Sequence, residues 1–259
     1  MTGVSERPST LDIGRVIQEL FSVLGRNITT FGTLAVILVG VPTAILYSFL
    51  GRAIASRDPT QIFSAGASNF AIGVIIVALL TLILQGTIIY GTVSDLNDRK
   101  VSVSDSLSIG LRAFLPLLGL GILLGLAVGA GMILLIIPGV MLAVAWCVAV
   151  PVYVVERPGV IASFGRAAAL TRGSRWPIFG LFVIYAIAAL IIQVVMGIVG
   201  GVLGVATIGG FPMLNFLIIT PLIQVATALI ASTGVAVLYV ELRRIRDGVG
   251  VQGLAAIFD

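Results

Sequence analysis

The chain has 259 residues, of which 59% are hydrophobic and only 10% are charged, and its formal net charge is +4. Soluble domains are roughly 45–50% apolar, so this composition excludes an ordinary water-soluble domain and favours an integral membrane protein. The chain has no histidine, which excludes the commonest general base, the usual zinc ligand and any Ser-His-Asp triad.

Six apolar stretches are predicted to cross the membrane as helices, because a spanning helix needs about 20 apolar residues. Continuous apolar runs favour helices over a transmembrane barrel, whose strands alternate lipid-facing and lumen-facing residues. The predicted spans are residues 31–50, 70–90, 114–137, 140–155, 178–206 and 213–239. The polar residues 1–10 do not resemble a cleavable signal peptide, so we expect the first span to remain as an anchor. The predicted fold class is therefore all-α, a polytopic membrane protein.

The basic residues predict the orientation of these spans. With both termini on one side, all of the 15 Lys and Arg residues except Arg52 and Arg57 fall on that side. Basic loops remain cytoplasmic, so we expect a multi-pass protein with cytoplasmic N- and C-termini. The basic residues of this side are Arg7, Arg15, Arg26, Arg99, Lys100, Arg112, Arg157, Arg166, Arg172, Arg175, Arg243, Arg244 and Arg246.

A repeated pattern suggests three units, each an amphipathic interfacial helix followed by a transmembrane hairpin. The amphipathic segments are residues 11–27, 104–112 and 159–172, and the units cover about 11–95, 103–156 and 158–247. They form one domain, 11–249, between an N-terminal tail, 1–10, and a cytoplasmic tail, 250–259. Glycine and proline place the outer turns at residues 51–69, 137–139 and 208–212.

The stretch around the third amphipathic segment, residues 154–180, carries one glutamate and four arginines. At 100° per residue, Val160, Phe164, Ala168 and Thr171 share one face and Arg166 points the opposite way, so the segment is predicted to rest on lipid headgroups. Its charges are explained either as a cytoplasmic anchor or as a ligand or partner site. The candidates for contact with lipid headgroups, which are anionic partners, are Arg15, Arg26, Arg166, Arg172 and Arg175.

Small and polar residues are expected to pack the spans, because apolar side chains gain little from leaving lipid. Glycines at four-residue spacing predict close helix contacts within the bundle or, alternatively, a homodimer face; they are Gly121, Gly125, Gly129, Gly197, Gly200, Gly201 and Gly204. The polar candidates either bond across helices or line a small cavity; they are Gln85, Gln193, Asn215 and Gln224. No span has an Asp, Glu, Lys or Arg at its centre, which argues against a coupled pump.

No motif predicts chemistry. The chain has neither a Walker A loop nor a GxSxG elbow, and its single cysteine, Cys147, excludes a disulfide framework or a cysteine metal cluster. We therefore predict a protein that is not an enzyme, with no catalytic residue, metal or cofactor. The arginines form no basic stripe with an aromatic platform, so nucleic acid is not an expected partner.

Two segments resemble a known family. LLIIPGVMLAVAWCVAVPVYVVERPGVIASFGRAAALTRGSRWPIFG, residues 134–180, and LYVELRRIRDGV, residues 238–249, are similar to the glycerophosphoryl diester phosphodiesterase membrane domain family. The resemblance implies a helical domain of the bacterial inner membrane. Some members carry a fused phosphodiesterase barrel, but these spans leave no room for a barrel of about 250 residues, and the required histidines are missing.

The leading hypothesis is a non-enzymatic membrane-organising, lipid-associated or partner-docking module. A permease or channel for a small solute or amphiphile, lined by the intramembrane polar residues, is the alternative. A third hypothesis is an accessory subunit that docks a protein partner on Leu254, Ile257 and Phe258 of the C-terminal tail.

Overall fold

The structure is a computed structural model that describes residues 11–55, 65–97, 103–206 and 215–248. Every element within these ranges is helical. In chain order the elements are α1 (Ile13–Ala35), the π-helical η1 (Val36–Gly40), α2 (Val41–Ala55), α4 (Ala65–Leu96), α5 (Val103–Leu134), α6 (Ile136–Trp146), α7 (Ala149–Glu156), α8 (Val160–Thr171), α9 (Arg175–Ala206), the π-helical η2 (Asn215–Ile219) and α11 (Thr220–Asp247).

The described residues contain six helices that are long and apolar enough to cross a membrane, which confirms the predicted all-α class and the six spans. They are Ile13–Phe49, Phe70–Leu96, Ser106–Leu134, Ile136–Glu156, Arg175–Val199 and Leu217–Asp247. The two predicted tails, the outer turn at 208–212 and part of the turn at 51–69 lie outside the described residues.

Only the third amphipathic segment is a helix of its own. Gly159 (φ 99°) and Gly173 (φ 90°) flank α8 with left-handed backbone that a side chain disfavours, and so they separate α8 from its neighbours. The first segment instead runs without a break from α1 into η1 and α2, and the second is the start of α5. The expectation of separate helices at 11–27 and 104–112 was therefore wrong, because no residue there breaks the helical hydrogen bonding.

Prolines explain three irregularities in the spans. η1 directly precedes Val41-Pro42, and η2 directly precedes Thr220-Pro221. A proline has no N–H for the carbonyl four residues earlier and its ring crowds that carbonyl, and a π-helical turn makes room for it. Pro151 has the same effect on the fourth span, which is interrupted between α6 and α7 at Cys147 and Val148.

The turn between α5 and α6 lies two residues before its predicted position. Leu135 alone is extended (φ −161°, ψ 137°), and α6 begins at Ile136, so Pro138 and Gly139 sit in the first turn of a helix. Proline is tolerated there because the first N–H groups of a helix have no partner within it. Gly139 instead allows close packing, since a Cβ on it would lie 2.6 Å from the backbone nitrogen of Met132.

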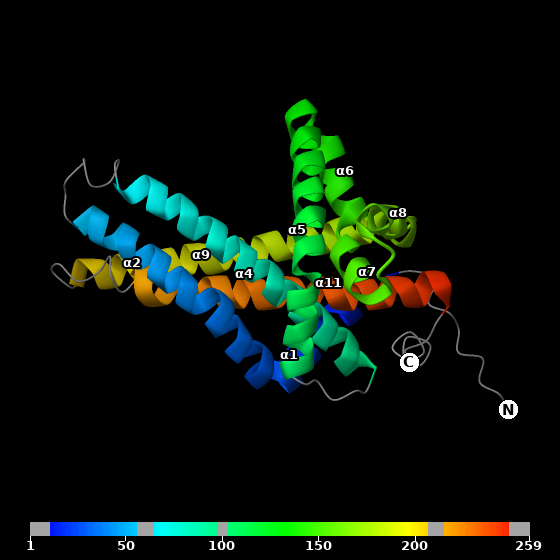
Figure 1. The fold of residues 1–259 in the computed structure, drawn as a ribbon, viewed down its shortest axis with the longest axis horizontal. Helices are drawn as coiled ribbons and strands as arrows, with labels where there is room; N and C mark the ends of the chain where they lie inside the picture. The colour runs from blue at the N-terminus through cyan, green and yellow to red at the C-terminus, as the bar shows by residue number, and fades with distance from the viewer. Residues whose placement is uncertain (1–10, 56–64, 98–102, 207–214, 249–259) are drawn as a thin grey trace.

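The six spans do not form a parallel bundle. In Figure 1, α5 and α6 lie side by side and stand upright, whereas α9 and α11 run across the view. The hairpin partners α2 and α4 pack together, as do α5 and α6, but α11 packs mainly against α1 and α4 and only slightly against α9. α11 is therefore the helix around which the fold is assembled.

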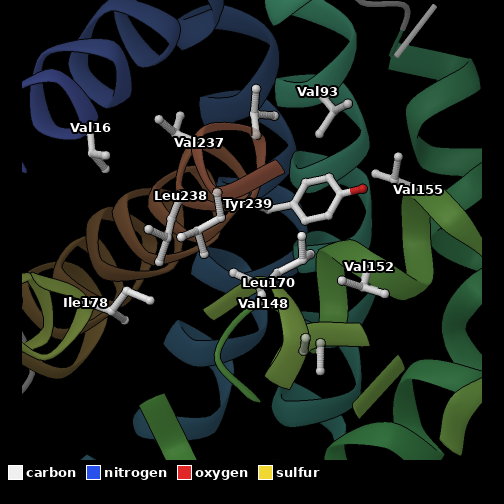
Figure 2. Close-up of a cluster of buried hydrophobic side chains, with 14 of the residues drawn as sticks. Val16, Val93, Val148, Val152, Val155, Leu170, Ile178, Val237, Leu238 and Tyr239 are labelled. Carbon is white, nitrogen blue, oxygen red and sulfur yellow. The ribbon is translucent and has the colours of Figure 1, made fainter. Parts of the chain in front are cut away.

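The largest group of buried apolar side chains surrounds the second half of α11. Figure 2 shows Tyr239 near its centre, with its hydroxyl directed toward the side of Val155 and its ring between Val93 above and Leu170 and Val148 below. These residues come from α4, α7, α8 and α11 and from the segment before α7, so this cluster holds the interrupted fourth span, the separate helix α8 and the central span together.

Candidate functional site

A network of ionic side chains lies where α7, α8 and α11 meet. Glu156 is the last residue of α7, Arg166 lies in the middle of α8, and Asp247 ends α11. The guanidinium of Arg166 donates to both carboxylates, with an Nε–Oε2 distance of 2.9 Å to Glu156. Burial by itself would lower the pKa of Arg166, but its hydrogen bonds to Asp247 and Glu156 outweigh this and raise the pKa, so Arg166 remains charged.

Two further side chains of α11 complete this network. The hydroxyl of Tyr239 donates to Oε1 of Glu156 over 2.9 Å, and Arg243 donates to the Tyr239 oxygen over 3.3 Å. Nε of Arg243 also lies 3.4 Å from Asp247. We call Glu156, Arg166, Tyr239, Arg243 and Asp247 the α11 network. These ion pairs and hydrogen bonds join α7, α8 and the end of α11.

Two other ion pairs involve α1. One joins α1 to the same end of α11, and the other joins α1 to α4. Arg15 lies 3.3 Å from the buried carboxylate of Glu241, and Arg26 lies 2.7 Å from Asp95. Asn27 adds a hydrogen bond of 2.8 Å to Asp95. These pairs link α1 to both α11 and α4.

A groove opens beside the α11 network. It has a volume of about 150 Å³ and is lined by Arg166, Ala169, Leu170, Arg172, Arg246 and Asp247. Nε of Arg246 donates to the carbonyl of Ala169 over 3.2 Å, which ties the end of α11 to the end of α8. Three of the six lining residues are cationic and one is anionic, so the groove is suited to an anion.

The five predicted lipid-contact arginines fall into two groups. Arg15, Arg26 and Arg166 are held in the ion pairs described above. Arg172 is exposed and Arg175 is half-buried, and within the described ranges neither has a carboxylate partner. Arg246 was not among the predicted lipid-contact residues. Its position as a basic residue in the last turn of a helix is a feature that the sequence alone can indicate.

The predicted lipid-facing side of α8 packs on protein instead. The ring of Phe164 lies edge-on to Trp146, with centroids 5.0 Å apart, and the buried Thr171 hydroxyl donates to the carbonyl of Ala145 over 3.0 Å. On this face, Phe164 and Thr171 therefore contact α6. The sequence could not distinguish packing on protein from contact with lipid, because the apolar face of a helix has the same residue pattern in both cases.

The intramembrane polar candidates whose side chains the structure describes differ in their exposure. Gln193 on α9 and Gln224 on α11 are exposed, Gln85 on α4 is half-buried, and the side chain of Asn215 lies outside the described residues. These positions give no support to a shared polar path.

The glycine contacts differ from those expected. A Cβ on Gly125, Gly129 or Gly197 would have no atom within 4 Å, and one on Gly121 would only touch Leu82. The side-chain surroundings of Gly200, Gly201 and Gly204 lie outside the described part. Close approaches occur at other glycines, which lack the four-residue repeat: Gly86, Gly110, Gly131 and Gly139.

Comparison of the chain with protein-family models, curated proteins and solved structures finds no significant match. Within the described ranges, no three Cys, Asp or Glu side chains gather as metal ligands would. The groove and the α11 network are therefore the features that bear on function.

Proposed function

We propose that this chain is a non-enzymatic integral membrane protein that associates with anionic lipids, as a membrane-organising or partner-docking module. One observation carries this proposal: in a chain with six span-length helices, Arg166, Arg172 and Arg246 from separate parts of the chain line one groove. Each basic residue near an anionic membrane surface contributes about 1 kcal/mol of attraction.

We further propose that the groove faces the cytoplasm of a bacterium and that the chain is a membrane domain of the glycerophosphoryl diester phosphodiesterase membrane domain family. The excess of arginine at the connections on this side supports the orientation. Reporter tags on the two termini test it. Both tags are expected to report from inside sealed cells, and tags on opposite faces would contradict the arrangement.

Lipid preference is the direct test of the proposed association. The purified full chain, reconstituted in nanodiscs of mixed lipid, is expected to enrich anionic over zwitterionic lipids among those that remain bound in native mass spectrometry. Replacing Arg15, Arg26, Arg166, Arg172 and Arg175 with glutamine should reduce the enrichment.

The matched control for this test replaces Arg52 and Arg57, the basic residues expected on the other side, with glutamine. Equal lipid retention by the wild type, the five-site variant and the control would count against an anionic-lipid function. Because three of the five arginines also form ion pairs, the Arg172→Gln/Arg175→Gln double variant should be measured separately. It removes cationic charge without breaking any of those pairs.

A further inference from the structure

We infer that the groove between α8 and the end of α11 binds a phosphate group, with Arg172 and Arg246 as its ligands. This inference adds a specific ligand site to the proposed lipid association. It rests on the proposed function only in taking a lipid as the source of the phosphate. Arg166 also lines the groove but is committed to Glu156 and Asp247, so it serves as a fixed wall and not as a ligand.

The two proposed ligands are exposed cations whose charge no carboxylate of the described residues neutralises. Nε of Arg246 is held by the Ala169 carbonyl, so the guanidinium is oriented while its two terminal nitrogens make no hydrogen bond to a described residue. A guanidinium offers a planar fork of donors that matches two oxygens of a phosphate. Arg172 follows the last residue of α8 and approaches the same groove from the other helix.

The charge balance of the groove favours an anion. The carboxylate of Asp247 is the only acidic group of the lining, and it is engaged by Arg166 and by Arg243. The ends of α8 and α11 also bring carbonyl groups here, which act as about half a negative charge for each helix. Glu156 offsets Arg166 and Arg243 offsets Asp247, so the charges of Arg172 and Arg246 against about one negative charge from the two helix ends leave the groove net positive.

The groove is large enough to hold a lipid headgroup but not a whole lipid. Its volume of about 150 Å³ corresponds to about five waters at liquid density, which accommodates a phosphate group but not acyl chains. Acyl chains would have to extend outside it, along the exposed apolar surface of the neighbouring helices.

Two exposed side chains place the groove at headgroup depth. Ile161 on α8 is 74% exposed, and Trp176 at the start of α9 is 82% exposed. Tryptophan is enriched at the boundary between hydrocarbon and water, and Trp176 comes four residues after Arg172. A phospholipid whose chains lie beside α9 would therefore present its phosphate near the groove.

The test uses the full chain, purified in a nonionic detergent. It measures binding of dioctanoyl phosphatidylglycerol, dioctanoyl phosphatidylcholine and inorganic phosphate by native mass spectrometry and by thermal stabilisation. Arg172→Gln and Arg246→Gln are each expected to weaken phosphatidylglycerol binding about tenfold, as the loss of a charge-assisted hydrogen bond predicts. The control is Arg244→Gln, which removes an exposed cation from the same helical turn but not from the groove. It should change binding less than about twofold.

Asp247→Asn is expected to change phosphatidylglycerol binding in the direction opposite to Arg172→Gln and Arg246→Gln. It removes the negative charge of the groove, so it should tighten phosphatidylglycerol binding even though it lowers the unfolding temperature by breaking the pair with Arg166. Weaker binding by a folded Asp247→Asn variant would overturn the inference, because removing a negative charge from the lining should favour an anion bound there.

The three probes separate the sources of the phosphate. Losses with phosphatidylglycerol alone identify a lipid headgroup, whereas parallel losses with inorganic phosphate identify a site for phosphate as such. Binding that is unchanged in Arg172→Gln and Arg246→Gln, or reduced no more than in Arg244→Gln, would overturn the inference. In that case nanodiscs that still enrich anionic lipids would leave the proposed function standing. Conversely, arginine-dependent phosphate binding without lipid enrichment would preserve the groove and remove the proposed function.

Discussion

Helices α9 and α11 are both long and apolar enough to span a membrane, yet they occupy opposite positions in the fold. In its most apolar stretch, only 6% of α9 is buried inside the protein, compared with 50% for α11. The more hydrophobic of the two is α9, the peripheral one. In lipid, apolar side chains gain little by leaving the hydrocarbon, whereas polar ones need protein partners. The buried Ser232, Thr233, Glu241 and Arg243 therefore mark α11 as the central span.

The largest effect expected from this contrast comes from leucines on the two helices. Leu242 on α11 is 1% exposed and Leu190 on α9 is 60% exposed. Leu242→Ala should lower the free energy of unfolding by roughly 3–4 kcal/mol, because it leaves a cavity that the packed helices cannot fill. Leu190→Ala should cost less than about 0.5 kcal/mol. Thermal unfolding in detergent measures both, and equal losses would contradict the assignment of α11 as the centre.

A second prediction extends the contrast to the two halves of α5. A Cβ on Gly110 would clash with the Thr87 side chain and lie 2.7 Å from the carbonyl oxygen of Ile83, whereas a Cβ on Gly125 would meet nothing. Gly110→Ala should therefore destabilise the protein by roughly 2–3 kcal/mol. Gly125→Ala should be neutral or stabilise it by up to about 1 kcal/mol, because alanine favours the helix. The same unfolding assay distinguishes the opposite signs.

The third prediction concerns the charged end of α11. Glu156→Gln removes the carboxylate that pairs with Arg166 and accepts from Tyr239. Because Glu156 is only partly buried, the loss should be about 2 kcal/mol, below the 3–5 kcal/mol of a fully buried pair. Arg157→Gln, at the next and exposed position, is the control and should change stability by less than about 0.5 kcal/mol. A Glu156→Gln variant as stable as this control would show that the α11 network does not hold α7 and α8.

The smallest effect is expected away from α11, where α1 meets α4. Asp95→Asn removes the charge that Arg26 and Asn27 contact, and it should cost about 1 kcal/mol because Arg26 is half exposed to solvent. Glu19 lies 3.8 Å from the same guanidinium and is itself well exposed, so Glu19→Gln should be nearly neutral. Raising the salt concentration should shrink the difference between the two variants, and a salt-independent difference would argue against an ionic origin.

The sequence indicated only some of the residues that line the groove. Arg166 and Arg172 stood out because they lie in a charged segment of an apolar chain, and both line the groove. Arg246 and Asp247 join them from a position about 80 residues further along the chain. No local pattern predicts which residues of α11 meet α8, because that depends on how the helices cross.

The sequence by itself determined the all-helical class and the number of helices that are long and apolar enough to span a membrane. Both follow from the transfer of side chains between water and hydrocarbon, which each stretch of chain obeys independently of its neighbours. Only the tertiary structure decided that α11 is central, that α8 rests on α6, and that Arg166 is neutralised while Arg172 and Arg246 are not. These outcomes depend on which surfaces meet, and hydrocarbon favours many such arrangements almost equally until polar pairs and close-packed glycines select one.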